Sequence, residues 1–498
     1  MTFALIFPII LPFSTAALCL VLWKRAFAQH LVSLLGSAAH LVACVLLLVS
    51  VMDAGIQVHE VGSWPAPFGI SLVCDHLSAL MVIITGIVGM ATAVYARGEL
   101  KEHTHVDGFY PLFHILVGGL SGAFLTGDLF NLYVCFEVML MASFGLLVWG
   151  QTPAQLDAAV KYVVINLLAT LLLLMGLALL YGLTGTLNIA HIHQKILTHE
   201  ASNLLTAVAF IFMTAFGIKA GLFPLFFWLP AAYHTPLIAV SALFAGMLTK
   251  VGVYALIRVF SLVFSHDISV THGLLLMMAV LTMVTGVLGA AAQNEFRRIL
   301  SFHIISQVGY MVLGLALWTP LAITGAVFYL VHHMIVKANL FLISGLSRDV
   351  LGTLKLDKGG GLYQSKPIIG LLFFISAFSL AGFPPLSGFW AKLLIIRASL
   401  EVQQYLLGAV AVLVGLMTVY SMVKIWLKAF WKPLPPNIPP QPVPALSFWK
   451  ITPVCVLTLL TLIIGLAAEP IYQMAAETAH EILNPQLYVE AVLKGGHP

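Results

Sequence analysis

Charged side chains are scarce in this sequence: Asp, Glu, Lys and Arg make up only 8% of its 498 residues, whereas hydrophobic residues make up 61%. This balance excludes an ordinary soluble domain and is typical of a polytopic membrane protein. The apolar stretches are long and do not alternate with polar residues. They favour helices over a β-barrel, because a helix satisfies its backbone hydrogen bonds within itself. The predicted fold class is therefore an all-α polytopic membrane protein.

Cysteine is also scarce, and the five cysteines show no CxxC or CxxxC spacing. Neither disulfides nor a metal cluster is expected from such isolated residues. The sequence has no P-loop, GxGxxG or HExxH motif in a fitting context, so nucleotide hydrolysis, dinucleotide binding and zinc chemistry have no support. No cofactor and no metal site is therefore predicted. The net charge of +4 comes mostly from loops, which indicates contact with anionic lipid rather than with nucleic acid.

Fourteen apolar stretches of bilayer length are present, and each is predicted to be a transmembrane helix. They begin near residues 3, 30, 73, 110, 129, 160, 204, 238, 274, 299, 322, 367, 405 and 451. The first stretch, MTFALIFPIILPF, has no basic residue ahead of its apolar run. It is expected to be a retained span rather than a cleaved signal peptide.

Lysine and arginine are concentrated in alternate loops, as expected for loops on the cytoplasmic side of a membrane. Fifteen lie in one set of loops, and four lie in the opposite loops and tail: Lys195, Arg258, Arg397 and Lys494. Both termini are therefore predicted to lie outside. The segment PLPPNIPPQPVP at 433–444 is predicted to be a cytoplasmic linker, and residues 471–498 are interpreted as a short polar tail.

One acidic residue and four lysines fall within the predicted spans: Glu137, Lys219, Lys250, Lys337 and Lys392. An ionisable group in hydrocarbon costs several kcal/mol, so each of these residues is by default a candidate for a functional role. Glu137 is the only acid deep in a span, and Lys219 is its candidate partner. Separating such an ion pair would let the lysine give up its proton, so the pair can act as a switch.

Two of the predicted spans are interrupted by proline and glycine. Lys219 lies within the segment FGIKAGLFPLFFWLP, and Lys392 is the last residue of the segment AGFPPLSGFWAK. A broken helix is tolerated at membrane depth only beside protein or a water-filled cavity. Broken spans in comparable places of two halves of a chain indicate a transporter built from inverted repeats.

Histidines accompany the buried lysines: His303, His332 and His333 lie in apolar stretches, and His333 shares a helix face with Lys337, four residues later. Histidine titrates near neutral pH, and burial brings lysine towards that range, so the set is suited to relaying protons. Structural roles stay open for individual members. Lys250 or Lys392 alone could reach the membrane surface, and each histidine could be a hydrogen-bonded core residue. Glu137 and Lys219 could form a purely structural buried ion pair.

Four segments, FEVMLMASF, GIKAGLFPLFFWLPAAYHTPLIAVSALFAGMLTKVGVYALIR, RRILSFHIISQVGYM and HHMIVKANLFLISG, resemble the proton-conducting antiporter-like subunits shared by Mrp cation/proton antiporters and respiratory complex I. The resemblance covers almost the whole chain and is greatest to the D type of Mrp subunit. It implies two inverted repeats, each with one discontinuous helix. Three helices in 1–109 would precede the repeats at 110–260 and 261–430, and the linker, a last helix and the tail would occupy 431–498.

The resemblance also implies roles for individual residues. The relay positions of the family are filled here by Glu137, Lys219, Lys250, Lys337 with His332 or His333, and Lys392. In the family, the glutamate pairs with the first lysine, and protons continue through the later groups. A lysine at position 392 is typical of Mrp subunits, whereas complex I subunits can carry glutamate there.

The function that this resemblance implies is proton translocation within a hetero-oligomeric Mrp complex of the bacterial cell membrane. The other Mrp subunits would be its partners, and protons would be exchanged for Na⁺ or K⁺. An alternative is the same fold in a redox-driven complex, such as complex I or a membrane-bound hydrogenase. A third is a membrane scaffold whose charges only fix helix packing. As an antiporter subunit or as a scaffold, the chain is not expected to be an enzyme.

Overall fold

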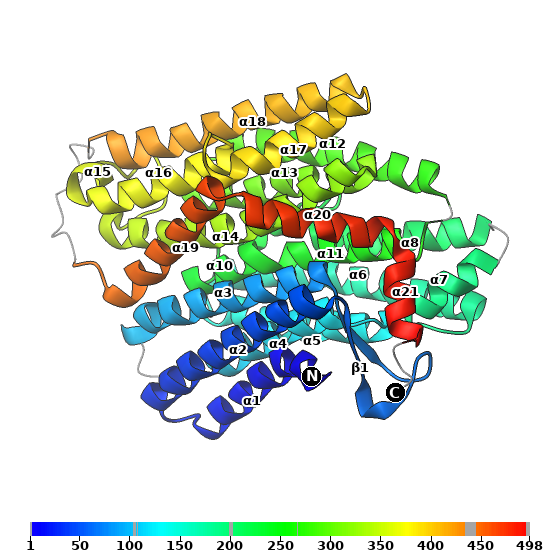
Figure 1. Ribbon diagram of the computed structural model, residues 1–498. Helices are drawn as coiled ribbons and strands as arrows, with labels where there is room; N and C mark the ends of the chain where they lie inside the picture. The colour runs from blue at the N-terminus through cyan, green and yellow to red at the C-terminus, as the bar shows by residue number, and fades with distance from the viewer. Residues whose placement is uncertain are drawn as a thin grey trace.

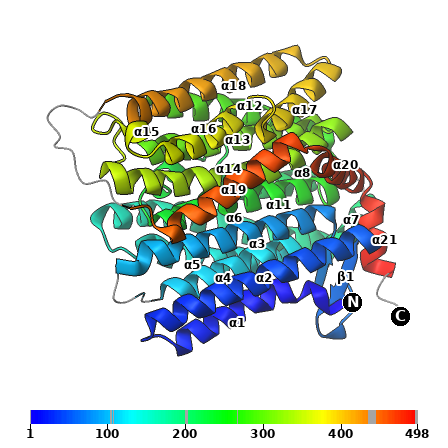
Figure 2. The same ribbon diagram turned by 60° about the vertical axis from the view of Figure 1, so that its left-hand side comes forward.

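The computed structural model describes residues 2–102, 106, 108–198, 203–265, 267–433 and 445–494. The proline-rich linker predicted at 433–444 lies outside these residues apart from residue 433. The described helices run side by side in one bundle, with α1 at one edge and α18 at the opposite edge in both views (Figure 1, Figure 2).

The helices follow one another along the whole chain. The first part contains η1 (Thr2–Leu5), α1 (Phe7–Val21), α2 (Ala26–Ala54), η2 (Val61–Ser63), α3 (His76–Glu99), η3 (Leu100–Glu102), α4 (Phe109–Leu125), α5 (Leu129–Val148), α6 (Pro153–Thr184) and α7 (Ile189–Thr198). The central part contains α8 (Asn203–Ala220), α9 (Trp228–Ala232), α10 (Ile238–Leu243), η4 (Phe244–Leu248), α11 (Thr249–Leu262), α12 (Ile268–Ala292), α13 (Phe296–Leu317) and α14 (Pro320–Leu351). The last part contains α15 (Leu362–Ser365), α16 (Pro367–Ala381), α17 (Ser387–Glu401), α18 (Tyr405–Ile425), η5 (Trp426–Trp431), α19 (Phe448–Leu466), α20 (Glu469–Leu483) and α21 (Pro485–Lys494).

Eleven helices among the described residues are long and apolar enough to cross a membrane, counting α10 to α11 as one and α18 with η5 as one. Three shorter apolar helices, α1, α4 and α16, have 15, 17 and 15 residues. They occupy the predicted stretches that begin near residues 3, 110 and 367. The prediction of a mostly helical, multi-pass membrane protein is confirmed.

A short hairpin departs from the all-α prediction. Strands β1 (Gln57–Glu60) and β2 (Ser71–Cys74) pair antiparallel, with Gln57 opposite Cys74. The apolar stretch that begins near residue 73 was expected to be helical from its start. It is extended at first because the helix begins only after Asp75, whose side chain accepts a hydrogen bond from Ser78 N at 2.9 Å and so caps α3.

The interpretation of 471–498 as a polar tail is wrong for its described part. Residues in this region form α20 and α21, which pack against α3, α14 and α7. Ala475, Ile482, Tyr488 and Val489 are buried in these contacts. The spacing of the apolar residues, which puts them on one face of each helix, explains why these helices dock although their composition is polar.

Helix α14 lies in the middle of the bundle in both views and is buried over most of its length (Figure 1, Figure 2). Its neighbour α13 packs closely against α12, where a Cβ atom on Gly286 would lie 2.4 Å from Ser306 N. Only glycine permits this approach of the two backbones. The polar side chains of α13 and α14 are therefore held in the centre of the molecule, away from its lipid-facing surface.

Candidate proton-relay site

The first predicted break lies between α8 and α9. Helix α8 ends at Ala220, and Gly221 follows with a φ of +77°, a conformation that favours glycine. The break leaves carbonyl groups of α8 without partners in their own helix. Trp228 at the start of α9 donates its indole Nε1–H to Ile218 O at 3.0 Å. Lys219 thus lies in the last turn of a helix whose end is tied to the next segment.

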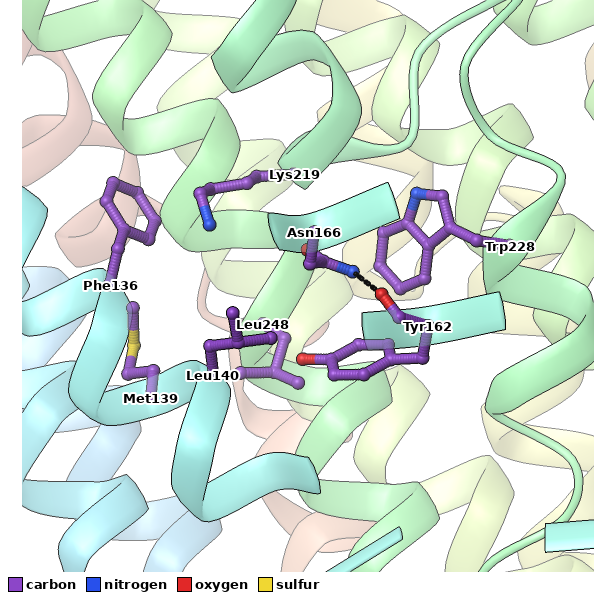
Figure 3. Close-up of a pocket in the computed structure, with 8 residues that line it drawn as sticks. All are labelled: Phe136, Met139, Leu140, Tyr162, Asn166, Lys219, Trp228 and Leu248. Atoms are coloured by element: carbon purple, nitrogen blue, oxygen red, sulfur yellow. Dashed lines mark hydrogen bonds between the residues drawn. The ribbon is translucent and has the colours of Figure 1, made fainter. Parts of the chain in front are cut away.

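Lys219 is 6% exposed, and its Nζ lies 4.6 Å from the ring centroid of Phe136 (Figure 3). Beside it is a cavity of about 20 Å³, lined also by Asn166, Tyr162 and Trp228. This volume holds one water molecule. In the close-up, the Asn166 amide nitrogen donates to the backbone carbonyl of Tyr162 at 2.9 Å (Figure 3).

Glu137 and Lys219 do not form an ion pair in this structure, because no nitrogen to oxygen distance between them is 4.0 Å or less among the described ion pairs. Glu137 is partly exposed on α5, but its Oε1 atom is buried and has no hydrogen-bond partner among the described residues. The pairing of Glu137 with Lys219 stays a prediction.

Lys250 is fully buried on α11, as its apolar context predicts. Its Nζ donates a hydrogen bond to the carbonyl of Ala245. Ala245 belongs to η4, a single π-helical turn that precedes α11. Such a turn leaves carbonyl groups outside the ordinary α-helical ladder, so a lysine can bind one without breaking the helix.

Helices α13 and α14 bring together the predicted histidines and Lys337. His303, His333 and Lys337 are all 0% exposed. Lys337 Nζ donates to Leu300 O of α13 at 3.0 Å, which joins the two helices. Within the described part of the chain, neither ring nitrogen of His303 or of His333 has a hydrogen-bond partner.

The second break lies between α16 and α17. Gly382 follows α16 with a φ of +95°, and α17 begins at Ser387. Lys392 is 6% exposed, and its Nζ donates to Ala381 O at 2.8 Å. It also lines a cavity of about 290 Å³ between this break and α18. His332 from α14 reaches the same break, where its Nδ1 lies 2.7 Å from Ser387 Oγ.

Neutral polar residues that the sequence did not single out extend the site. Tyr329 on α14 donates a hydrogen bond to Gln307 Oε1 on α13, and its ring stacks on that of Tyr310 at 5.2 Å between centroids. Ser306 and Gln307 follow His303 by three and four residues, so they share its helix face. This periodicity was visible in the sequence, but serine and glutamine carry no charge that marks them as costly in a span.

Several buried polar atoms of this region have no partner among the described residues. They are Nδ1 and Nε2 of His303, Nδ1 and Nε2 of His333, Nε2 of His332, Oγ of Ser306 and Nε2 of Gln307. Buried polar groups are normally hydrogen-bonded, to ordered water where protein groups are absent. These unpartnered atoms lie along two neighbouring helices, α13 and α14.

The pair Asp75 and Arg258 is a contrasting case, and it corrects the placement of Arg258 in an external loop. Arg258 lies within α11 and is 4% exposed. Its Nη1 and Nη2 donate to the two carboxylate oxygens of Asp75 at 2.5 and 2.7 Å. Further bonds to Ser78 and Tyr254 complete the cluster, in which every described buried side-chain polar atom has a partner. This cluster is a structural tie between α3 and α11.

Known proteins resemble this chain over most of its length. Residues 126–418 match the family described as NADH:quinone oxidoreductase/Mrp antiporter, transmembrane. The chain is 46% identical over 490 residues to the D subunit of the Na(+)/H(+) antiporter of Alkalihalophilus pseudofirmus, covering 98% of this chain and 99% of that protein. The chain belongs to the NADH:quinone oxidoreductase/Mrp antiporter family.

Two solved structures resemble the chain over nearly its whole length. A chain of the Mrp complex from Dietzia sp. DQ12-45-1b has a TM-score of 0.92 and 32% identity, with 99% of this chain and 100% of that chain covered. A chain of respiratory complex I from Thermus thermophilus has a TM-score of 0.82 and 23% identity, with 97% and 99% covered. The second likeness shows the fold alone.

Proposed function

We propose that this chain is the proton-translocating D-type member of a hetero-oligomeric Mrp antiporter, which exchanges protons for Na⁺ or K⁺ across the bacterial cell membrane. Its relatives support this function, since similarity to the D subunit of a Na(+)/H(+) antiporter extends over 98% of the chain. The observation that carries the proposal is the burial of Lys337 on α14 beside histidines of α13 and α14, most of whose ring nitrogens have no partner among the described residues. The partners are the other subunits of the Mrp complex.

In the proposed path, Lys219 receives a proton through the water-sized cavity beside it, under the influence of Glu137. The proton then passes Lys250 and the group of His333, His303 and Lys337 in the centre. These groups have no direct hydrogen bonds to one another among the described residues, so water must bridge them. His332 and Lys392 form the last part of the path at the second break.

The finer architecture is part of the same proposal. We infer that the chain crosses the membrane fourteen times, that residues 110–260 and 261–430 are inverted repeats, and that both termini lie outside. The glycine-ended breaks after α8 and after α16 support two discontinuous helices. Each break has a buried lysine beside it, and each lysine adjoins a cavity.

A role in a redox-driven complex is less well supported. This chain is 23% identical to the chain of complex I, whereas it is 46% identical to the D subunit of the Na(+)/H(+) antiporter over nearly the same length. The lysine at position 392 also follows the Mrp pattern. The conducting groups themselves would act in the same way in either assembly, because they move protons and not electrons.

Substitution of Lys337 in the assembled complex tests the proposal. Lys337→Met keeps the bulk of the side chain and removes its charge and its protons. In vesicles with an imposed Na⁺ or K⁺ gradient, a pH-sensitive dye should report loss of cation-driven proton movement for this variant. Lys358→Met, at an exposed position, is the matched control and should retain exchange. A scaffold that only needs helix packing would tolerate both changes, so full activity of Lys337→Met would contradict the proposed function.

A further inference from the structure

The start of α17 is bound to α14 and to α16 through one hydroxyl group. Ser387 is 0% exposed, and its Oγ lies 2.7 Å from His332 Nδ1 and 3.0 Å from Ser379 Oγ. Ser379 also accepts a bond from Gly388 N at 3.4 Å. A hydroxyl both donates and accepts, so Ser387 can accept from His332 when Nδ1 carries a proton and donate to it when Nδ1 is bare.

Steric contacts hold this arrangement in place. A Cβ atom on Gly388 would lie 1.9 Å from Ser379 O and 2.9 Å from His332 Nε2. On the other side, a Cβ atom on Gly465 of α19 would lie 2.7 Å from Ser387 N. The start of α17 is therefore packed closely against α14, α16 and α19, with no room for a methyl group on Gly388 or on Gly465.

The same short break also holds Lys392. The carbonyl that accepts from Lys392 Nζ belongs to Ala381, two residues after Ser379. A Cβ atom on Gly382 would lie 2.8 Å from Lys392 Cδ, so the lysine stem runs directly along the break. His332 and Lys392 thus both contact the short segment that joins α16 to α17.

We propose that Ser387 is a positioning residue that couples the hydrogen bonding of His332 to the placement of Lys392 at the break between α16 and α17. When His332 changes between donating and accepting at Nδ1, Ser387 turns its hydroxyl and exchanges its bond with Ser379. This exchange changes the position of the Ala381 carbonyl. In one position the carbonyl accepts a hydrogen bond from the Lys392 amine, and in the other it releases the amine. This inference rests on the proposed function, because it assumes that His332 and Lys392 belong to the proton path.

Other titratable groups face the same region and enter any pH dependence. They are His333 and Lys337 on α14, His303 on α13, Lys392 on α17, and Tyr310 and Tyr329, whose rings lie near Lys392 and His332 respectively. Among the described residues, no carboxylate forms an ion pair with any of them. The region is therefore cationic when its groups are protonated. A positive charge on His332 repels a positive charge on Lys392, so protonation of one group disfavours protonation of the other.

The pH profile of exchange by the assembled complex tests the coupling. Ser387→Ala should lower the maximal rate on the order of tenfold, because the lysine amine is misplaced, and should shift the pH of half-maximal exchange. Ser387→Thr keeps the hydroxyl and should restore the pH of half-maximal exchange. Ser399→Ala is the matched control, since Ser399 is equally buried on α17 but bonds to Ile395 O of its own helix. It should leave rate and profile unchanged.

Two outcomes would overturn the coupling: an unshifted profile for Ser387→Ala, or the same shift for Ser387→Ala and Ser399→Ala. If Ser387→Ala fails to assemble, His332→Asn decides, because asparagine can still bond to Ser387 but cannot titrate. This variant should itself shift the pH of half-maximal exchange, because residue 332 no longer changes between donating and accepting, and an unshifted profile contradicts the proposal. Loss of exchange in Lys337→Met with a normal Ser387→Ala would leave the proposed function intact and reject only the coupling.

Discussion

The Arg258 guanidinium and the Asp75 carboxylate form a two-point ion pair, at 2.5 and 2.7 Å, between residues 183 positions apart in the chain. Both side chains are almost fully buried, as are the histidines of α13 and α14. The two clusters differ in one property. Among the described residues, the atoms of the ion pair are satisfied by protein groups, whereas most ring nitrogens of the histidines are not. Burial is therefore common to the two clusters, and the unpartnered ring nitrogens distinguish the histidines of the proposed proton path from the ion pair.

The ion pair gives the first prediction. Arg258→Met leaves Asp75 buried without its partner, and breaking a buried pair in this way costs about 3–5 kcal/mol. The assembled complex should show a clearly lower thermal midpoint in detergent, while exchange per assembled complex stays the same. Arg397→Met is the control, because Arg397 pairs with Glu401 at the surface with 67% of its side chain exposed. Loss of exchange with unchanged stability would instead place Arg258 in the proton path.

The second prediction concerns Glu137 and Lys219 as one functional unit. Glu137→Gln and Lys219→Ala should each abolish cation-dependent proton exchange, because the first removes the charge that acts on the lysine and the second removes the proton carrier. Lys161→Ala, at an exposed position on α6, should behave like the unmodified protein. Membrane fractionation checks that each variant is inserted. Normal exchange by both Glu137→Gln and Lys219→Ala would show that the pair is not a switch.

The third prediction concerns orientation. With the exposed native Cys455 replaced, a cysteine at Leu197 on α7 should react with an impermeant thiol reagent added outside the cell. A cysteine at Lys355, which is also exposed, should react only after the membrane is opened. The basis is the uneven distribution of lysine and arginine between the two sets of loops. The opposite labelling pattern would invert the topology.

The fourth prediction uses His234, which lies in the loop between α9 and α10 and bonds through Nδ1 to Pro230 O at 2.7 Å. Burial lowers the pKa of His234 to about 4, and Arg297 and Arg298 act in the same direction. Between about pH 4 and about pH 6.5 the unfolded chain therefore binds more protons at this site, so its contribution to stability falls as the pH drops through this range.

His234→Gln removes this titration, so the stability of the variant should decline less than that of the unmodified protein as the pH is lowered from about 6.5 towards about 4. Unfolding midpoints at several pH values measure the difference. Above about pH 7 the histidine is neutral in both states, and the exchange profile of the variant should match that of the unmodified protein. A shifted exchange profile at neutral pH would mean that His234 carries protons.

The sequence alone could predict the ionisable groups in the spans, because placing such a group in a membrane costs a large free energy. Lys337 and His333 share a face because they are four residues apart on one helix, and the structure has them on α14 as expected. Arg258 was misplaced because a basic residue near the end of an apolar stretch resembles a loop residue. Its partner, Asp75, comes from a distant part of the chain, and nothing local to either residue indicates the pair.

The neutral members of the site could not be found in the same way. Serine and glutamine are uncharged and occur in many helices, so the presence of Ser387 and Gln307 in a span does not by itself indicate a function. Their importance depends on which side chains meet across α13, α14 and α17, and that is set by packing. The helical conformation of α20 and α21 was missed for a related reason, because amphipathic helices that dock on a protein surface have the composition of a soluble segment.

The cavity beside Lys219 has a consequence for selectivity. About 20 Å³ holds one water molecule, and Lys219, Asn166 and Tyr162 line the cavity together with apolar side chains. A sodium or potassium ion with its hydration shell is far too large for this space, and a bare ion would meet a cationic amine and too few oxygen atoms to replace its shell. If Lys219 lies on the proposed proton path, that path therefore excludes alkali cations at this point by size and charge, without a dedicated filter.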